Sequence, residues 1–247
     1  MATGASDSAP PAQRLREGIA RVRTLRDAAR ADPVLAQDRL LVRAWQADRL
    51  ARTYPDLLAS PRYGPAAEFF LSDLYGPKDF SARDEEVARI IPTMARMLPS
   101  SALETIALAV ELDALAEGLD QQVAVALRRL QPGARALEIS EATYAKAYRA
   151  ASSTAERERQ IWLTGRIGTA LDRLARKPLI AGALRLMEGP AHAAGLGALH
   201  DFLARGFAAF RGMRGADEFL AVIGARESRI NARLFAADPR AFDAESA

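Results

Sequence analysis

The 247-residue sequence contains no cysteine. This absence excludes disulfides, thiolate metal sites and cysteine nucleophiles, and it fits a reducing cytoplasm. Histidine occurs only twice, which argues against a metal site, because such sites need several convergent ligands. Residues branched at Cβ are sparse, whereas alanine and leucine dominate. This composition favours helix throughout the chain.

The sequence also lacks the long apolar runs of a membrane protein. No stretch approaches the roughly 20 uninterrupted apolar residues of a membrane span. The start of the chain lacks the basic and apolar segments of a signal peptide. We therefore expect a cytoplasmic protein with a disordered head at residues 1–11, an all-helical domain at 12–236 and a frayed tail at 237–247.

The charge balance gives little sign of a nucleic-acid partner. The formal net charge is +3, and only three of the 34 basic residues are lysine. No long basic block is interleaved with aromatic residues, so we predict that the protein does not bind nucleic acid. Walker loops, dinucleotide fingerprints, nucleophile elbows and Glu-x-x-His motifs do not occur. An enzyme would have to use acids, arginine, tyrosine or histidine without a recognisable motif, and we lean against one.

Apolar stripes with helical spacing predict an all-α protein, a single bundle of about eight to nine helices. The clearest stripe steps by fours and threes from Leu108 to Leu130, after a capping box near residue 101. It predicts a helix at about 101–130 that lies at the centre of the bundle. The turn after it makes residues 131–137 the best candidate for a seam between subdomains. If this helix is central, its acids must find partners among the arginines.

Several shorter signals predict where other helices begin, end or approach a neighbour. Asp32-Pro33 is a cap and first-turn pair. Ser153 and Glu156 either cap a new helix or belong to one long helix. Lys177-Pro178 opens a short apolar helix that we expect to end near Met187, and residues 189–197 form a flexible, small-sided stretch. Gly206, inside a later helix, predicts close approach to another backbone.

The most unusual composition lies between Phe69 and Asp84. Four aromatic side chains fall within twelve positions here, and charged residues follow them at once. Pro65 suits the first turn of the helix that carries this stretch. We favour a structural corner in which Arg83 pairs with Asp73 or Asp79. The alternative is a polar pocket beside an aromatic wall, which could hold a small ligand.

The segment Phe69-Phe70-Leu71-Ser72-Asp73-Leu74-Tyr75 resembles the signature of the bacterial FFLEELY motif proteins. Five of its seven residues match that signature, while Ser72 and Asp73 stand where it has Glu-Glu. The resemblance implies a bacterial helical protein and carries over no catalytic residue.

The two histidines, His192 and His200, are eight residues apart. On one continuous helix they would lie two turns apart, too far to bind one metal ion directly. Nearby glycines leave that geometry open. We favour a cap or a surface imidazole for each, and we assign no metal ligand. Haem ligation by one of them is a weaker alternative.

Our first functional hypothesis is a binding protein with an apolar, aromatic pocket for a small hydrophobic ligand such as a lipid, acyl chain, quinone or haem. The alternative is an interaction protein, such as a homodimer, whose C-terminal helices pack against a partner beside Gly206. An exposed apolar patch on the folded chain would favour this alternative. The candidate ligand-binding residues are Phe69, Phe70, Asp73, Tyr75, Phe80, Arg83, His192, His200 and Phe207.

Overall fold

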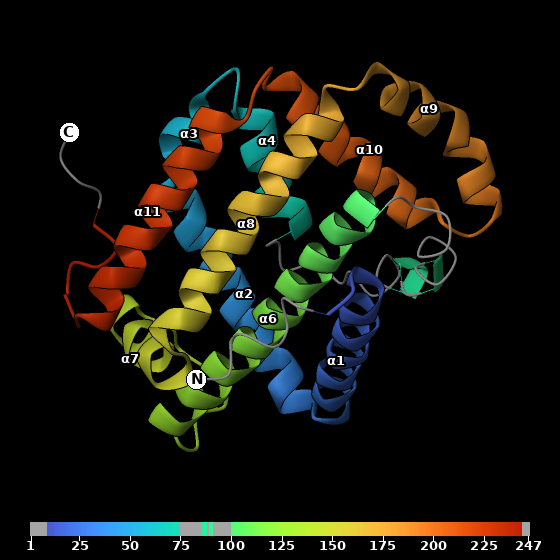
Figure 1. Cartoon of the computed structure of the whole chain (residues 1–247). Coiled ribbons are helices and arrows are strands. Elements are labelled where there is room, and N and C mark those ends of the chain that lie inside the picture. Colours follow the sequence, from blue (N-terminus) through green and yellow to red (C-terminus); the bar gives the residue numbers. More distant parts are fainter. Residues whose placement is uncertain (1–8, 75–84, 88, 91–99, 244–247) are drawn as a thin grey trace. The chain divides into compact units, whose positions relative to one another are not determined.

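The computed structural model describes residues 9–74, 85–87, 89–90 and 100–243. Within these ranges the chain forms helices and no strand, which confirms the all-α prediction (Figure 1). The helical elements number eleven in the described part of the chain. This is slightly more than predicted, because the total includes short segments near residue 65.

The chain divides into two compact units. The first contains residues 1–39 and 90–167, and the second contains residues 40–89 and 168–247. Two helices, α2 (Pro33–Thr53) and α8 (Thr154–Ala175), contribute residues to both units. Residues 131–137, where we expected a seam, lie within the first unit. The number of independently folding domains stays a prediction.

In the first unit, α1 (Pro11–Ala31) and α7 (Glu141–Ala151) both pack against α6 (Figure 1). The long helix α6 spans Ser100–Leu130 and confirms the helix predicted from the leucine stripe. Leu119, Val123 and Leu127 of its leucine stripe are buried together, since residues three and four apart share one face, whereas Leu130 at the end of the stripe is 47% exposed. The innermost side chains of this unit include Leu15, Leu119, Val123, Leu127 and Leu163.

Arginines from neighbouring helices neutralise the acids of α6, as its position requires. Glu117 is almost fully buried, and Arg39 and Arg26 both pair with it. Arg26 also binds Asp113, with 3.0 Å between Nη2 and Oδ2. A buried carboxylate stays ionised only with such partners, because burying an unpaired charge in a protein interior costs on the order of several kcal/mol.

Local helix signals are confirmed at two junctions. The Asp32 carboxylate accepts the backbone N–H groups of Val34 and Leu35, so it caps α2. Ser153 and Glu156 form a capping box, which resolves the two alternatives: α7 ends at Ala151 and α8 is a separate helix. The backbone N–H of Ser153 lowers the pKa of Glu156.

The second unit is built from the end of the chain and from short segments between residues 55 and 74 (Figure 1). The helix α10 packs against both α4 and α9. The elements are α3 (Pro55–Ala59), α4 (Gly64–Phe69), the π-helical turn η1 (Phe70–Leu74), α9 (Pro178–Ala193), α10 (Gly197–Gly212) and α11 (Asp217–Phe235). After α11, Ala241 is buried, and Phe242 lies 5.7 Å from Trp45 between ring centres.

Two sequence expectations in this unit are wrong. Helix α9 does not end near Met187, and residues 189–193 are part of it despite Pro190. A Schellman motif ends the helix: the N–H of Leu196 donates to the carbonyl of Ala191, and the N–H of Gly195 donates to the carbonyl of His192.

The neighbour that Gly206 approaches is not a backbone but the ring of Phe69. A Cβ atom at Gly206 would lie 2.8 Å from Cζ of that ring. Because the ring lies where a side chain at 206 would be, glycine lets α10 pass close to α4.

Candidate functional site

The aromatic residues of the motif belong to the packed core of the second unit. Phe69 is buried and lies 5.4 Å from Phe202 between ring centres. Phe70 lies 6.0 Å from Phe210 and 5.7 Å from Phe219. Two consecutive phenylalanines, the last residue of α4 and the first of the π-helical turn, therefore both face other rings. The described rings of the motif are thus packed against other aromatic rings of the core.

Of the other predicted ligand-binding residues, some lie in the described part of the chain and some do not. Phe207 is partly buried against the same core. Asp73 is buried and accepts hydrogen bonds from Arg205 of α10, at 2.6 Å, and from the Ser72 hydroxyl. Arg205 was not among the partners that we expected for this acid. Tyr75, Phe80 and Arg83 lie outside the described residues, as do Asp79 and the corner that they were expected to form.

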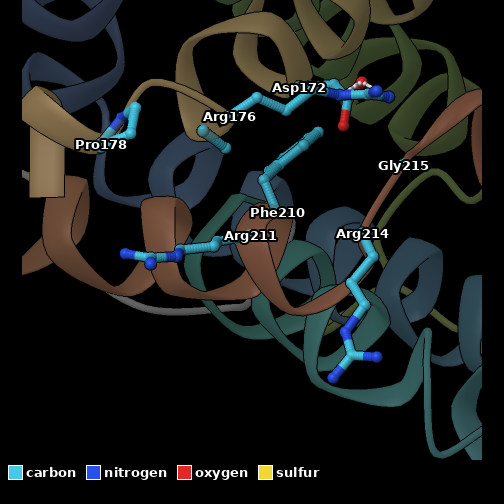
Figure 2. Close-up of a pocket in the computed structure, with 8 residues that line it drawn as sticks. Asp172, Arg176, Pro178, Phe210, Arg211, Arg214 and Gly215 are labelled. Atoms are coloured by element: carbon cyan, nitrogen blue, oxygen red, sulfur yellow. Dashed lines mark hydrogen bonds and ion pairs between the residues drawn. The ribbon is translucent and has the colours of Figure 1, made fainter.

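A cavity of about 220 Å³ lies beside Phe210 (Figure 2). Three arginines line it, yet they do not converge on one point. Arg176 is paired with Asp172 at 2.6 Å, while the Arg211 and Arg214 side chains extend away in different directions. Ligand pockets usually enclose roughly 300–1,000 Å³ and carry convergent polar groups. This cavity has neither property.

A more specific arrangement lies at the turn between α9 and α10. Gly195 adopts a left-handed conformation with φ of +66° and reverses the chain. Two side chains from the segment before residue 91 fix the turn. Arg89 donates to the Gly195 carbonyl, and the Glu86 carboxylate accepts the Leu199 N–H at 2.7 Å. Our expectation for the histidines assumed a continuous helix, which this reversal replaces.

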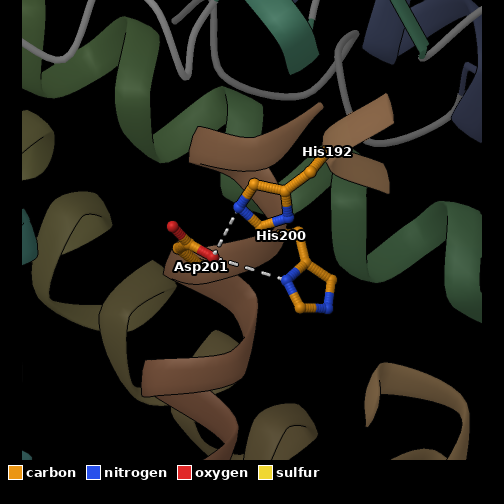
Figure 3. A group of neighbouring side chains, drawn as sticks. All are labelled: His192, His200 and Asp201. Atoms are coloured by element: carbon orange, nitrogen blue, oxygen red, sulfur yellow. Dashed lines mark hydrogen bonds and ion pairs between the residues drawn. The ribbon is translucent and has the colours of Figure 1, made fainter. Parts of the chain in front are cut away.

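The reversal brings His192 and His200 together with Asp201 (Figure 3). The imidazole ring centres are 5.8 Å apart. One nitrogen of each histidine lies 3.5 Å from Oδ1 of Asp201. The three ligand atoms all lie within 4.8 Å of one another. The two-turn separation that a continuous helix would give does not apply, because the chain reverses between the two histidines.

Backbone carbonyls orient both imidazoles. Nδ1 of His192 donates to the carbonyl of Glu188 at 2.9 Å, and Nε2 of His200 donates to that of Leu184 at 2.8 Å. A carbonyl only accepts, so these two nitrogens carry protons, and the other nitrogen of each ring faces Asp201. The bond to Leu184 is the largest cause that raises the pKa of His200, and Asp201 adds to it.

Sequence reasoning missed the part that Asp201 plays, although it directly follows His200. Sequence distance gave no reason to group it with His192. The available signal was the pair of glycines at 195 and 197, which permits a reversal. Gly197 has a direct role as well, because a Cβ atom there would lie 2.8 Å from Cδ2 of His192.

The outward side of α9 is a second unusual feature of this hairpin. Leu179 and Leu186 are 86% and 78% exposed, respectively. They belong to a line of exposed, uncharged residues spaced by three and four along the helix, which we call the α9 seam: Leu179, Gly182, Leu186, Gly189 and Ala193. On the opposite side Ala191 is buried. Such spacing places all seam residues on one face.

The expected interface beside Gly206 is not the exposed one. Gly206 faces Phe69 inside the second unit, and Phe202 packs there too. The exposed apolar surface lies instead on α9. In the described part of the chain, no helix is long and apolar enough to cross a membrane.

Comparison with known proteins identifies the family. A domain of unknown function (DUF8198) matches residues 25–241. The chain belongs to this family. Comparisons with curated proteins and with solved structures gave no match. The DUF8198 match includes the α9 seam and the histidine cluster, and its description names no activity. Functional inference for this family member therefore rests on geometry.

Proposed function

We propose that this protein is an interaction protein that forms a homodimer through the α9 seam. The observation that carries the proposal is the exposure of Leu179 and Leu186 along a line of uncharged residues, with Arg185 at its border. Large exposed apolar side chains that share one face are typical of interaction surfaces. This is the alternative that an exposed apolar patch was expected to favour.

The order of residues in the seam fits a second copy of itself. Large and small residues alternate along it from Leu179 through Gly182 and Leu186 to Gly189, and a second small residue, Ala193, follows. In a dimer with twofold symmetry, a contact from one residue to another is repeated in reverse. If two α9 helices cross antiparallel with the axis at Leu184, Leu186 faces the partner's Gly182. The same register sets Leu179 against the partner's Gly189.

Each leucine then fills space that a partner glycine leaves open. One register satisfies both pairs, so the seam is complementary to itself in size. Small residues at such positions let helix axes approach to about 8 Å, the close end of the usual range. A Cβ atom added at Gly182 or Gly189 would meet no described atom within 4 Å. The notches therefore remain open on a single chain.

The other uses of this surface have less support. A helix that lies on a membrane usually carries several basic residues on its polar face and aromatic anchors on the other. Helix α9 has one arginine and no aromatic residue. A pocket for a hydrophobic ligand, our first hypothesis, loses support because Phe69 and Phe70 pack against each other and against rings of α10 and α11.

Sedimentation velocity over a range of protein concentrations tests the dimer. We expect the wild type to convert from monomer to dimer as concentration rises. Gly182→Glu should stay monomeric, because it places bulk and charge opposite the partner's Leu186. Gly224→Glu is the matched control: it lies inside α11, its Cβ direction is also open, and it should dimerise normally.

An exchange of sizes tests the register. Gly182→Leu alone should weaken the dimer, and Gly182→Leu combined with Leu186→Ala should restore it, because large again faces small. A wild type that remains monomeric at every concentration overturns the proposal. So does a wild-type monomer that sediments with anionic vesicles through Leu179 and Leu186, since that result assigns the seam to lipid.

A further inference from the structure

We propose that His192, His200 and Asp201 bind one divalent transition-metal ion of the zinc type at the turn between α9 and α10. All three residues lie on one chain and outside the α9 seam, so the site does not require the dimer. It begins with three atoms that can each donate a lone pair: Nε2 of His192, Nδ1 of His200 and Oδ1 of Asp201. Nitrogen and carboxylate ligands of this kind are those that zinc uses in proteins.

Two of the three spacings resemble those between ligands of one metal ion and are long for hydrogen bonds. Each histidine nitrogen lies 3.5 Å from Oδ1 of Asp201. An N–H···O hydrogen bond typically spans about 2.7–3.2 Å. Two ligands about 2.0–2.1 Å from a zinc ion at a tetrahedral angle lie roughly 3.4 Å apart. Both nitrogen-to-Oδ1 separations are close to that edge, and the third separation, between the two nitrogens, is within 4.8 Å.

The orientation of the rings is also that of metal ligands. A histidine that binds a metal almost always donates its other N–H to a carbonyl or carboxylate, which fixes the tautomer and aims the free nitrogen. Both rings here do so, toward the carbonyls of Glu188 and Leu184. The two histidines use opposite nitrogens, so His192 would bind through Nε2 and His200 through Nδ1.

The surroundings hold the ligands and leave a way in. The lack of a side chain at Gly197 leaves room for the His192 ring, and the Arg89 and Glu86 contacts fix the turn. The His200 side chain is only 9% exposed, whereas those of His192 and Asp201 are each 49% exposed. The buried histidine anchors one side of the site. The open side leaves room for water as a fourth ligand, as in zinc sites with three protein ligands.

The test is titration of the metal-free full-length protein, with any affinity tag removed, by Zn²⁺ in a calorimeter and by Co²⁺ in visible absorption. We expect one ion per chain and the strong absorption bands of tetrahedral Co²⁺. His192→Ala, His200→Ala and Asp201→Asn should each weaken Zn²⁺ binding tenfold or more. His192→Ala is the most informative variant, because that side chain is half exposed and we expect its loss to leave the fold intact.

Asp48→Asn is the matched control, since Asp48 is an exposed helical acid in the same unit, and it should bind Zn²⁺ like the wild type. The nitrogen NMR chemical shifts of the imidazoles give a second readout. Zn²⁺ should change the chemical shifts of Nε2 of His192 and Nδ1 of His200. A wild type that takes up no Zn²⁺ at neutral pH overturns the proposal. The proposal is also overturned if the three variants bind Zn²⁺ as tightly as the wild type does. The dimer test is run on metal-free protein, so either proposal can fail alone.

Discussion

The contact between Gly206 and Phe69 allows a sharp test of how the second unit is packed. A methyl group at position 206 would lie 2.8 Å from Cζ of Phe69 and 3.3 and 3.5 Å from two other ring atoms. Carbon atoms pack best at about 3.5–4.0 Å. The ring would therefore have to move by roughly 1 Å. Phe70 and Phe202 pack against it and resist that movement.

Two opposite effects set the size of the change in Gly206→Ala. Replacing glycine by alanine inside a helix stabilises it by about 0.5–1 kcal/mol. Overpacking a core costs about 1–3 kcal/mol. The second effect should win, so we expect a net loss of about 1 kcal/mol. Gly224→Ala is the matched control, because its Cβ direction meets no described atom within 4 Å, and it should gain about 0.5–1 kcal/mol.

Urea unfolding followed by circular dichroism measures both variants. The expected result is a lower midpoint for Gly206→Ala and a higher one for Gly224→Ala, with the slope unchanged. Adding Phe69→Leu to Gly206→Ala should relieve part of the clash, seen as a coupling energy of about 0.5 kcal/mol or more. If Gly206→Ala stabilises as much as Gly224→Ala, the close packing of α10 on α4 is refuted.

The remaining predictions concern buried and exposed polar pairs of the second unit. Glu227 accepts a hydrogen bond from the Tyr54 hydroxyl at 2.8 Å and pairs with Arg49 at 2.6 Å. Glu227→Gln should therefore lower the free energy of unfolding, measured by urea titration, by about 1–3 kcal/mol. Burial is the largest cause that raises the pKa of Tyr54, and the charge of Glu227 is the second, so the Tyr54 hydroxyl stays a neutral donor. A hydrogen bond from Arg226 lowers the pKa of Asp56. The stability from this pair is therefore present above the unfolded pKa near 3.9 and lost as pH falls through the folded pKa. Asp56→Asn should show less acid dependence in thermal unfolding scans between neutral pH and about pH 3, and an unchanged dependence would contradict the assignment.

The elements that could be predicted from sequence are those set by neighbours along the chain. Asp32 caps α2 through N–H groups two and three residues away, and such contacts depend on local conformation alone. The leucine stripe of α6 is likewise a local pattern of 3.6 residues per turn. The need for partners at Glu117 followed from the burial of that helix, and arginines supply them.

The contacts that could not be predicted join residues far apart in the chain. Any of the many arginines could have paired with Asp73, and only the fold selects Arg205 of α10. The glycine at 206 indicated a close approach but not whether a backbone or a ring would fill the space. His192, His200 and Asp201 meet because Gly195 reverses the chain, and sequence spacing could give their distance only for a continuous helix.

The two proposals place their contacts on one hairpin, which has an energetic consequence. Ala191 is the one residue of helix α9 that is fully buried, so the apolar burial that holds the helix on α10 is modest. A metal ion would cross-link His192 of α9 to two ligands of α10 at the turn. That restraint would order the end of the α9 seam at Gly189 and Ala193 before a partner arrives. Since association must otherwise supply that ordering, the ion and the dimer should favour each other, and by linkage the effect is reciprocal.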